Sequence, residues 1–272
     1  MGLFTIDTAK CRKDHICASN CPLGLIDKGS GVPRAAQNAE DLCLGCGHCV
    51  SACPTGAFSH RAMTPEQCAP IDPELPAAAA AAEQWLRGRR SIRAYKVDPV
   101  DKAVLEGIIQ TATYGPSGHN TQPVEWLVVY DSSVVRRVAG HVIDWMRFTI
   151  REQPDFAKAL LLEHFVGHWE KGTDYACRNA PHIVFTHAHK DNRMADSACT
   201  IALAYLDLAA RANGLGACWA GYVDIATRCY PPLQKELGMP ADHRSYGAML
   251  VGYPKYKYYR IPVRKDARIN WR

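Results

Sequence analysis

The chain has 272 residues, with 32 Lys and Arg against 27 Asp and Glu, and its formal net charge is +5. A composition with 47% hydrophobic and 22% charged residues is that of a folded chain and excludes a disordered or collagen-like one. The mild charge argues against a nucleic-acid-binding surface. No apolar run approaches the ~20 residues that span a bilayer, and the sequence start has no features of a signal peptide. We therefore expect a cytoplasmic protein without a nucleic-acid or membrane partner.

The first informative feature is a group of cysteines near the start of the chain, where seven of the twelve lie within 53 residues. Cys43, Cys46, Cys49 and Cys53 are followed by Pro54 in the spacing C-x2-C-x2-C-x3-C-P. This spacing is typical of bacterial ferredoxins, in which three cysteines of the run hold one iron–sulfur cluster and the fourth ligates another. A structural zinc site is the alternative, because C-x2-C pairs also bind zinc. That alternative leaves the third cysteine and the Cys53-Pro54 pair unexplained.

An imperfect copy of this run begins 32 residues earlier, at Cys11. Cys11, Cys17 and Cys21 take its first, third and fourth positions, and Cys21 is again followed by a proline. Asp14 stands in the second position, where the later copy has a cysteine. Two copies of one ligand run form an internal repeat. The region therefore resembles the two-cluster bacterial ferredoxins.

The resemblance implies two iron–sulfur clusters whose ligand sets exchange their last cysteines. The first set is Cys43, Cys46, Cys49 and Cys21. The second set is Cys11, Cys17, Cys53 and Asp14. Three alternatives stay open at the second cluster: Asp14 ligates the fourth iron of a [4Fe-4S] cluster, the cluster is [3Fe-4S], or Asp14 is only a turn residue and His15 or water lies at the site. A carboxylate is a harder ligand than a thiolate, so a fourth iron on Asp14 would be held less firmly.

A stretch rich in proline and then in alanine, residues 64–83, separates this region from the rest of the chain. Prolines break helices and extend the backbone, so this composition is typical of a linker. We therefore predict a two-cluster ferredoxin domain over residues 1–63, a linker with the start of a helix over 64–83, and a second domain over 84–272.

The second domain shows helical and strand patterns in a mixed order. Capping and turn residues predict a helix between Asp98-Pro99 and Gly115-Pro116, and another after Asp131. Short apolar runs predict strands at 125–130, 182–186, 217–222 and 244–252. A helix predicted over 192–213 is apolar or small almost all round, which indicates burial on both sides and a subunit interface. Strands and helices without strict alternation predict an α+β fold.

Four segments of this domain together indicate a flavin pocket. Arg89, Arg90, Ser91 and Arg93 offer guanidinium groups and a hydroxyl to phosphate oxygens. The glycine-punctuated segment 115–123 offers backbone amides to the polar edge of a heterocycle. Small residues over 214–221 let the backbone approach a flat ring, and a basic stretch follows the turn at 252–254. Each segment alone is a weak signal, and the combination is much more specific.

This set, in this order over about residues 84–272, resembles the nitroreductase-like FMN superfamily. The resemblance implies an α+β homodimer that binds FMN at the subunit interface, with C-terminal segments embracing the partner. It assigns the FMN phosphate to Arg89, Arg90, Ser91 and Arg93, together with Arg260 and Arg264 from the tail. It assigns the flavin ring and ribityl chain to Ser117, Asn120 and Gln122, and the flavin N5 region to the amides around Ala220 and Gly221. No catalytic residue is assigned.

A ferredoxin domain joined to an FMN domain predicts a reductase whose flavin receives electrons from the clusters of the same chain. The resemblance implies an external low-potential donor such as a ferredoxin or flavodoxin, with NAD(P)H as another possible donor. It also implies a small organic acceptor, namely a nitroaromatic, a quinone or an activated alkene, reduced by hydride from FMN N5. Aromatic residues in segment 141–176, among them Trp145, are predicted to cover the ring. The alternatives are a non-catalytic redox sensor or electron shuttle, and a zinc-knuckle binding module.

Three histidines near one predicted strand are weaker candidates. His187 and His189 lie two residues apart, so a strand would place them on one face, where they could chelate a metal. No third ligand is evident near them in the sequence. We therefore interpret both, together with His182, as ordinary residues of the strand.

Overall fold

The computed structural model describes residues 2–29, 31–70 and 79–272. The described residues form two compact units, one of residues up to 70 together with 119–121, and one of residues 79–118 and 122–272. Pro73 and Pro76 of the predicted linker lie outside the described residues.

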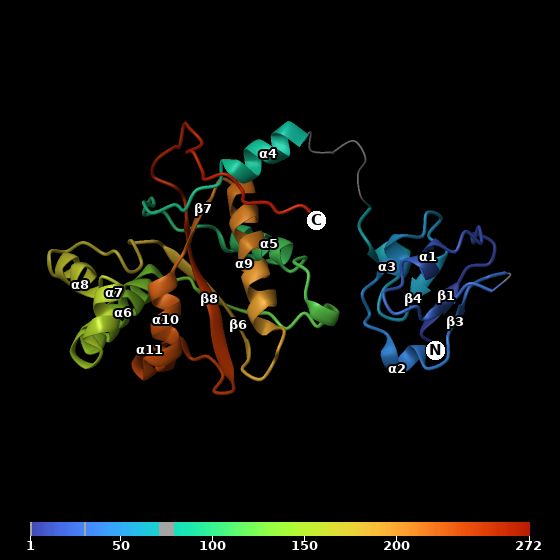
Figure 1. Cartoon of the computed structure of the whole chain (residues 1–272), viewed down its shortest axis with the longest axis horizontal. Coiled ribbons are helices and arrows are strands. Elements are labelled where there is room, and N and C mark those ends of the chain that lie inside the picture. Colours follow the sequence, from blue (N-terminus) through green and yellow to red (C-terminus); the bar gives the residue numbers. More distant parts are fainter. Residues whose placement is uncertain (1, 30, 71–78) are drawn as a thin grey trace. The chain divides into compact units, whose positions relative to one another are not determined.

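The first unit consists of short elements around a small core (Figure 1). Its strands form two antiparallel pairs, β1 (Phe4–Ile6) with β4 (Phe58–His60) and β2 (Ile26–Asp27) with β3 (Arg34–Ala35). Its helices are α1 (Ile16–Ser19), α2 (Ala39–Leu42), α3 (His48–Ser51) and the 3-10 turn η1 (Pro65–Gln67). Cys17, Val50 and Phe58 are among the buried residues of the core. A unit of this size buries little apolar surface, and small domains of this kind commonly depend on bound metal for their stability.

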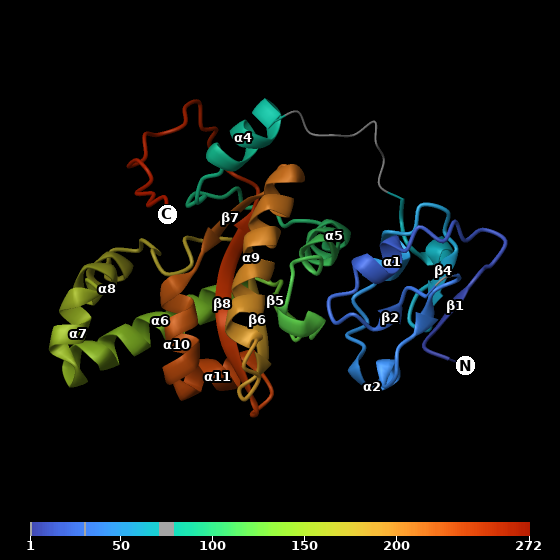
Figure 2. The same ribbon diagram turned by 45° about the vertical axis from the view of Figure 1, so that its right-hand side comes forward.

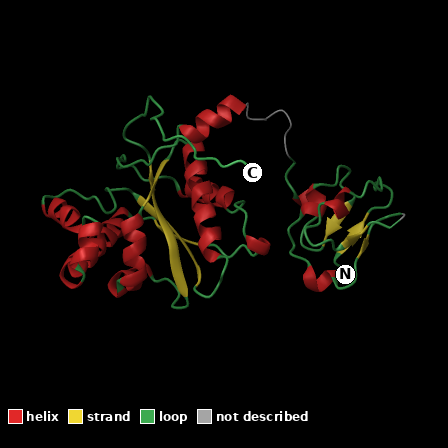
Figure 3. Cartoon of the chain, in the orientation of Figure 1, coloured by secondary structure: helices red, strands yellow, loops and turns green. Residues whose placement is uncertain are grey.

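The second unit is built on a four-stranded antiparallel sheet with helices on both faces (Figure 3). The strand order is β5 (Glu125–Val129), β6 (His182–His189), β8 (His243–Gly252) and β7 (Gly216–Trp219). The helices are α4 (Ala79–Arg87), α5 (Lys102–Ala112), α6 (Ser132–Glu152), α7 (Pro154–Ala159), α8 (Leu162–Glu170), α9 (Ala195–Ala212), α10 (Gly221–Cys229) and α11 (Pro231–Leu237). The 3-10 turn η2 (Gly118–Asn120) begins at the last residue of segment 79–118, and its other two residues are grouped with the first unit. The predicted α+β fold is confirmed.

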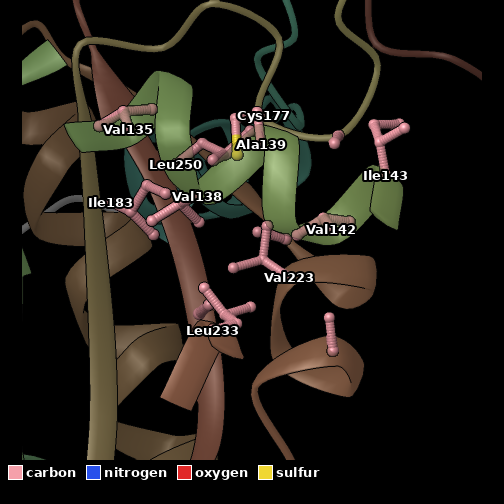
Figure 4. Packing of buried hydrophobic residues seen from close by; sticks show 14 of the residues in the cluster. Val135, Val138, Ala139, Val142, Ile143, Cys177, Ile183, Val223, Leu233 and Leu250 are labelled. Carbon is pink, nitrogen blue, oxygen red and sulfur yellow. The ribbon is translucent and has the colours of Figure 1, made fainter. Parts of the chain in front are cut away.

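The sheet separates two hydrophobic cores, and side chains of the central strands alternate between them. Ile183 and Leu250 face a core formed with α6, α10 and α11, where Val138, Val223 and Leu233 lie close together (Figure 4). Neighbouring strand residues face the opposite core, formed with α5 and α9. Because successive strand residues point to opposite faces, a continuous apolar strand is buried on both sides. The sheet is therefore the layer that positions the surrounding loops.

Helix α9 packs lengthwise on the sheet beside α5 (Figure 2). Its Leu203 and Leu206 are fully buried, whereas Tyr205 is 40% exposed. The helix predicted over 192–213 was expected to be buried on both sides, but within one chain one face of α9 is exposed to solvent. None of the described helices combines the length and apolar character needed to cross a membrane.

Two predicted boundaries in the second unit are wrong for local reasons. The helix expected at Asp98-Pro99 begins as α5, three residues later than Pro99, because Asp101 is its cap and accepts a hydrogen bond from Ala103 N at 2.7 Å. Before that cap, the Val100 N–H donates to His182 Nε2 at 2.8 Å, which holds this stretch outside the helix. The strand expected over 217–222 ends at Trp219, and the chain turns into α10.

Candidate functional site

Two cavities in the first unit each collect residues of both cysteine runs. The first cavity is lined by Cys43, Cys46, Cys49 and Cys21. The second cavity is lined by Cys11, Asp14, Cys17 and Cys53. In each case the last cysteine comes from the other run. The structure thus groups these residues in the two sets that the ferredoxin resemblance implies, while the metal they would hold stays a prediction.

The last cysteine of each run receives a backbone hydrogen bond from the residue four positions later. The Leu25 N–H donates to Cys21 Sγ at 3.3 Å, and the Ala57 N–H donates to Cys53 Sγ at 3.2 Å. Hydrogen bonds of this kind stabilise a negatively charged sulfur. The first set, with four cysteine sulfurs of which Cys21 receives an amide hydrogen bond, has the ligands that an iron–sulfur cluster needs.

Burial governs the acidity of the candidate ligands. It raises the pKa of the Cys49 thiol to about 11 and also raises the pKa of Cys17. At Cys53 burial acts in the same direction, but hydrogen bonds from Thr55 and Ala57 outweigh it and leave the pKa below its usual value. A metal ion must therefore displace protons from the Cys49 and Cys17 thiols, as its positive charge does in cysteine sites.

A histidine outside both cysteine runs contacts the first candidate cluster site. His60 on β4 is 7% exposed, and its Nε2 lies 3.5 Å from Cys43 Sγ. The other ring nitrogen, Nδ1, accepts a hydrogen bond from the Ala62 N–H at 3.1 Å. Because Nδ1 accepts, the proton of the neutral ring is on Nε2 and is directed at the cysteine sulfur. Burial lowers the pKa of His60, which favours this neutral form.

The second candidate cluster site contains two side chains that could complete it. Asp14 Oδ1 accepts a hydrogen bond from the Ile16 N–H at 3.1 Å, which leaves its second oxygen available. His15 lines the same cavity, and its Nδ1 is buried without a hydrogen-bond partner among the described residues. The structure therefore keeps both Asp14 and His15 as candidate fourth ligands.

Three distant segments of the second unit lie together at the predicted phosphate site. The Ile92 N–H donates to the Ala217 carbonyl at 2.9 Å, and the Lys96 N–H donates to the Tyr253 carbonyl at 2.9 Å. Gly216 packs so closely on Ile92 that a Cβ would lie 2.5 Å from Ile92 Cγ1. A glycine is required at this approach. The segment 89–96 is thus fixed between β7 and the chain after β8.

Arg89 and Arg90 line a cavity of about 330 Å³ beside this junction, together with Arg211 and the backbone of 214–217. Arg89 Nη1 lies 3.1 Å from Asp207 Oδ2, and Asp207 is only 5% exposed. Burial raises the pKa of Asp207, while the adjacent Arg89 opposes that rise. Because Asp207 neutralises only one of the three guanidinium groups, the cavity stays cationic and fits a phosphate.

The other predicted phosphate ligands are placed differently from one another. Arg264 lines an adjoining cavity with Arg89 and Arg90, whereas Arg260 is exposed between two lining stretches of the tail. Arg93 is exposed, and its guanidinium lies beside the Cys218 thiol. Ser91, which lies between Arg90 and Arg93 in the sequence, is partly buried. Within the part of the chain that the structure describes, Arg89, Arg90 and Arg264 are brought together, and Arg93 is not among the residues lining these cavities.

The segment 115–123 carries unusual backbone conformations. Asn120 and Gln122 have φ angles of 54° and 45°. The Gln122 N–H donates to Ser117 Oγ at 3.0 Å, and both residues line a cavity of about 160 Å³. Non-glycine residues in the left-handed region store strain, which is concentrated at functional sites. This geometry is consistent with the predicted role of the segment in contacting a ring.

Ala220 and Gly221 lie where β7 ends and α10 begins. The Ala220 N–H donates to the Ala248 carbonyl at 2.8 Å and is therefore already used by the sheet. Gly221 is the first residue of α10, and the first N–H groups of a helix have no acceptor within the helix. The Gly221 amide is accordingly the better placed of the two for an external acceptor.

Some residues were interpreted wrongly or missed at the sequence level. Trp145, predicted to cover a ring, is 3% exposed and belongs to the core on α6. Asp207 was missed, although an acidic residue on the buried side of an apolar helix was a signal in the sequence. His182 is a core residue as interpreted, since Nδ1 donates to the Tyr130 carbonyl at 2.8 Å and Nε2 accepts from Val100 N–H.

Comparison with protein families gives two matches. The nitroreductase family matches residues 86–253, and the 4Fe-4S binding domain matches residues 39–59. The second match covers the complete cysteine run and does not extend to the earlier one.

Individual relatives are distant. An iodotyrosine deiodinase of Drosophila melanogaster is 28% identical over 188 residues, which are 63% of this chain and 62% of the relative. The chain thus spans about three fifths of that relative's length. A 5,6-dimethylbenzimidazole synthase of Rhodospirillum rubrum is 26% identical over 206 residues, which are 69% of this chain and 86% of the relative. Among solved structures, a nitroreductase of Bacteroides fragilis with bound FMN matches with a TM-score of 0.57 and 19% identity, covering 69% of this chain and 96% of that one.

Proposed function

Because the chain belongs to the nitroreductase family, we propose that it is an FMN-dependent oxidoreductase whose flavin receives electrons through iron–sulfur clusters of the same chain. FMN supplies hydride chemistry when bound, and iron–sulfur clusters transfer single electrons. The family match and the 4Fe-4S match in one chain are the observation that carries the proposal. The FMN bound to the Bacteroides fragilis relative supports the choice of flavin.

The chain binds FMN with residues of four segments in this proposal. The phosphate is held by Arg89, Arg90, Ser91 and Arg93, with Arg264 and Arg260 from the tail. The ring and ribityl chain contact Ser117, Asn120 and Gln122, and the amides at Ala220 and Gly221 face N5. The cationic cavity around Arg89 and Arg90 supports the first assignment. Asp207 keeps the Arg89 guanidinium in one orientation, so it acts as a positioning residue.

The same proposal places two clusters in the first unit. One is held by Cys43, Cys46, Cys49 and Cys21, and the other by Cys11, Cys17, Cys53 and either Asp14 or His15. The grouping of these side chains around two cavities supports two clusters. The lower affinity of a carboxylate for iron favours a labile four-iron or a three-iron state of the second cluster.

We propose a homodimer as the working form. The support is the open face of α9, where Tyr205 is 40% exposed on a helix made mostly of apolar and small residues. The electron donor is an external low-potential protein such as a ferredoxin or flavodoxin, with NAD(P)H as the competing donor. The acceptor is a nitroaromatic, a quinone or an activated alkene.

The decisive experiment compares two routes of electrons into anaerobically purified protein. Iron, sulfide and FMN are quantified first, and turnover of a nitroaromatic is then followed with reduced ferredoxin or with NADPH as the donor. We expect ferredoxin-driven turnover in the wild-type protein and its loss in Cys43→Ser. The exposed Cys229→Ser variant is the matched control and should retain full turnover.

Flavin-free protein, or ferredoxin-driven turnover that survives Cys43→Ser, would contradict the proposal. Cluster reduction without turnover of any acceptor would favour a redox sensor or shuttle instead.

A further inference from the structure

Three potential metal ligands from three neighbouring strands meet at one end of the sheet of the second unit. They are Glu125 on β5, His187 on β6 and His243 on β8. One ligand atom of each lies within 4.8 Å of the other two. None of the three belongs to the cluster or flavin residues described above.

The strand register explains why these side chains meet. Glu125 is paired directly with His187, and His187 is paired with Ser245 on the other side. His243 precedes Ser245 by two residues, so it lies on the same face of the sheet. A one-residue shift of either strand would move a ligand to the opposite face. The cluster is therefore a product of the fold and not of sequence proximity.

The two imidazoles are already close to the spacing of a metal site. His187 Nδ1 and His243 Nδ1 are 2.9 Å apart, while Glu125 Oε1 lies 3.8 Å from the other ring nitrogen of His243, Nε2. Two nitrogens bound at about 2.0–2.1 Å to a tetrahedral zinc ion are roughly 3.3 Å apart. The imidazoles would separate by a few tenths of an ångström to hold an ion through their Nδ1 atoms, and the exposed Glu125 side chain would turn toward the same ion.

The three ligands differ in their exposure to solvent. His187 is 6% exposed, and the His243 side chain is 12% exposed. The Glu125 side chain is 60% exposed. The site is thus closed on the imidazole side and open to solvent at the carboxylate, which gives an ion a route of entry.

We propose that Glu125, His187 and His243 form a binding site for a divalent first-row transition-metal ion, with zinc as the representative ion. Two imidazoles and one carboxylate are a common protein ligand set for zinc and leave a fourth position for water. A bound ion would join β5, β6 and β8 at one end. The competing arrangement is a hydrogen-bonded histidine pair with Glu125 as a nearby acceptor and no ion.

His189 offers a matched control on the same strand. It is paired with His243, but its ring nitrogens lie 3.9 Å from Asp191 and 3.7 Å from Asp242. It is also more exposed than His187, with a side-chain exposed fraction of 47%. His189 is therefore engaged with carboxylates outside the cluster, and its replacement should leave the proposed site intact.

The test uses the full chain with its iron and flavin loaded, dialysed against zinc ions. We expect one zinc ion per chain in the wild-type protein and in His189→Gln, and its loss in the double variant His187→Gln/His243→Gln, with iron and FMN content unchanged. Zinc X-ray absorption should give a nitrogen and oxygen shell at about 2.0–2.1 Å, whereas zinc held by cysteines would give sulfur at about 2.3 Å.

A second variant protects the test against misfolding of the double variant. Glu125→Gln changes an exposed side chain, so it should fold, and we expect its zinc affinity to fall by roughly tenfold or more. Zinc should also raise the Tm of the wild-type protein and raise it less in Glu125→Gln. Equal zinc uptake by the wild-type and double-variant proteins, or a shell made only of sulfur, would overturn the proposal.

Discussion

The two cysteine runs of the first unit, the earlier loop (residues 11–21) and the later loop (residues 43–53), have left-handed backbone at equivalent positions, although the residues there differ. Gly45 and Gly47 have φ angles of 59° and 73°, and the corresponding Lys13 and His15 have 56° and 57°. Left-handed backbone costs a residue with a side chain roughly 1–2 kcal/mol, and glycine avoids this cost. The earlier loop therefore keeps the shape of a ligand loop although its residues disfavour it. This shape places Asp14 where the later loop has a cysteine.

The comparison separates two requirements of a cluster site. The backbone turn is the same in both loops, as are the amide hydrogen bonds to Cys21 and Cys53. The side chain at the second position differs, and among the described residues a histidine, His60, donates to a sulfur of the later loop only. Backbone shape is thus shared, and we expect the differing side chains to set iron affinity and redox potential.

The largest effect is expected from making the later loop like the earlier one. In Cys46→Asp a carboxylate replaces a thiolate, so one iron of that cluster should become labile and be lost in air. EPR of the oxidised protein should then report a three-iron signal that the wild-type protein lacks, with a matching fall in iron content. Cys68→Ser is the control, because Cys68 lies outside both cavity linings. Unchanged iron content in Cys46→Asp would remove Cys46 from the ligand set.

The reverse change should make the earlier loop like the later one. Asp14→Cys supplies a fourth thiolate on a backbone of the required shape, so a stable four-iron cluster should replace any three-iron signal in the EPR spectrum. If His15 is the fourth ligand instead, Asp14→Cys leaves the spectrum unchanged and His15→Ala alters it. A spectrum that responds to neither variant would contradict the assignment of both residues.

Local spacing explains why the cysteine sets that line the two cavities could be grouped from the sequence. The cysteines within one run are three or four residues apart, and the repeat shows which cysteine is the last of each run. Arg89 and Arg90, which line one cavity, are adjacent in the sequence and were named as candidates for the same reason. Strand β5 was also predicted well, since a short apolar run bounded by turn residues is a local signal.

Residues brought together by the tertiary fold were not predictable. His60 reaches Cys43 across the first unit, and Asp207 reaches Arg89 from a helix more than 100 residues later. His187 and His243 meet only because of the register between β6 and β8. No spacing rule encodes such contacts, so His187 was interpreted as an ordinary residue of the strand and His243 was not identified as a candidate ligand.

A smaller effect is expected from removing the hydrogen bond that only one loop has. In His60→Leu the Cys43 sulfur loses a donor that stabilises the more negative, reduced cluster. A hydrogen bond worth roughly 1 kcal/mol corresponds to a potential about 40 mV lower for a one-electron step. A redox titration followed by EPR measures both clusters together, and the second cluster is the internal control. Equal shifts in both potentials would indicate a general structural change and contradict the specific role of His60.

The smallest effect concerns the backbone itself and is tested by reciprocal variants. Gly45→Ala adds a Cβ that meets no described atom within 4 Å, so its cost is purely conformational. It should lower the stability of the first unit by about 1 kcal/mol, and Lys13→Gly should raise it by roughly 0.4–1 kcal/mol. The temperature at which cluster absorbance is lost should be lower in Gly45→Ala and higher in Lys13→Gly than in the wild-type protein. Gly47→Ala is a useful contrast, because its Cβ would also lie 2.7 Å from Met63 Sδ and should cost more than Gly45→Ala. A loss of stability in Lys13→Gly would show that the Lys13 side chain makes a contribution larger than the strain of its backbone.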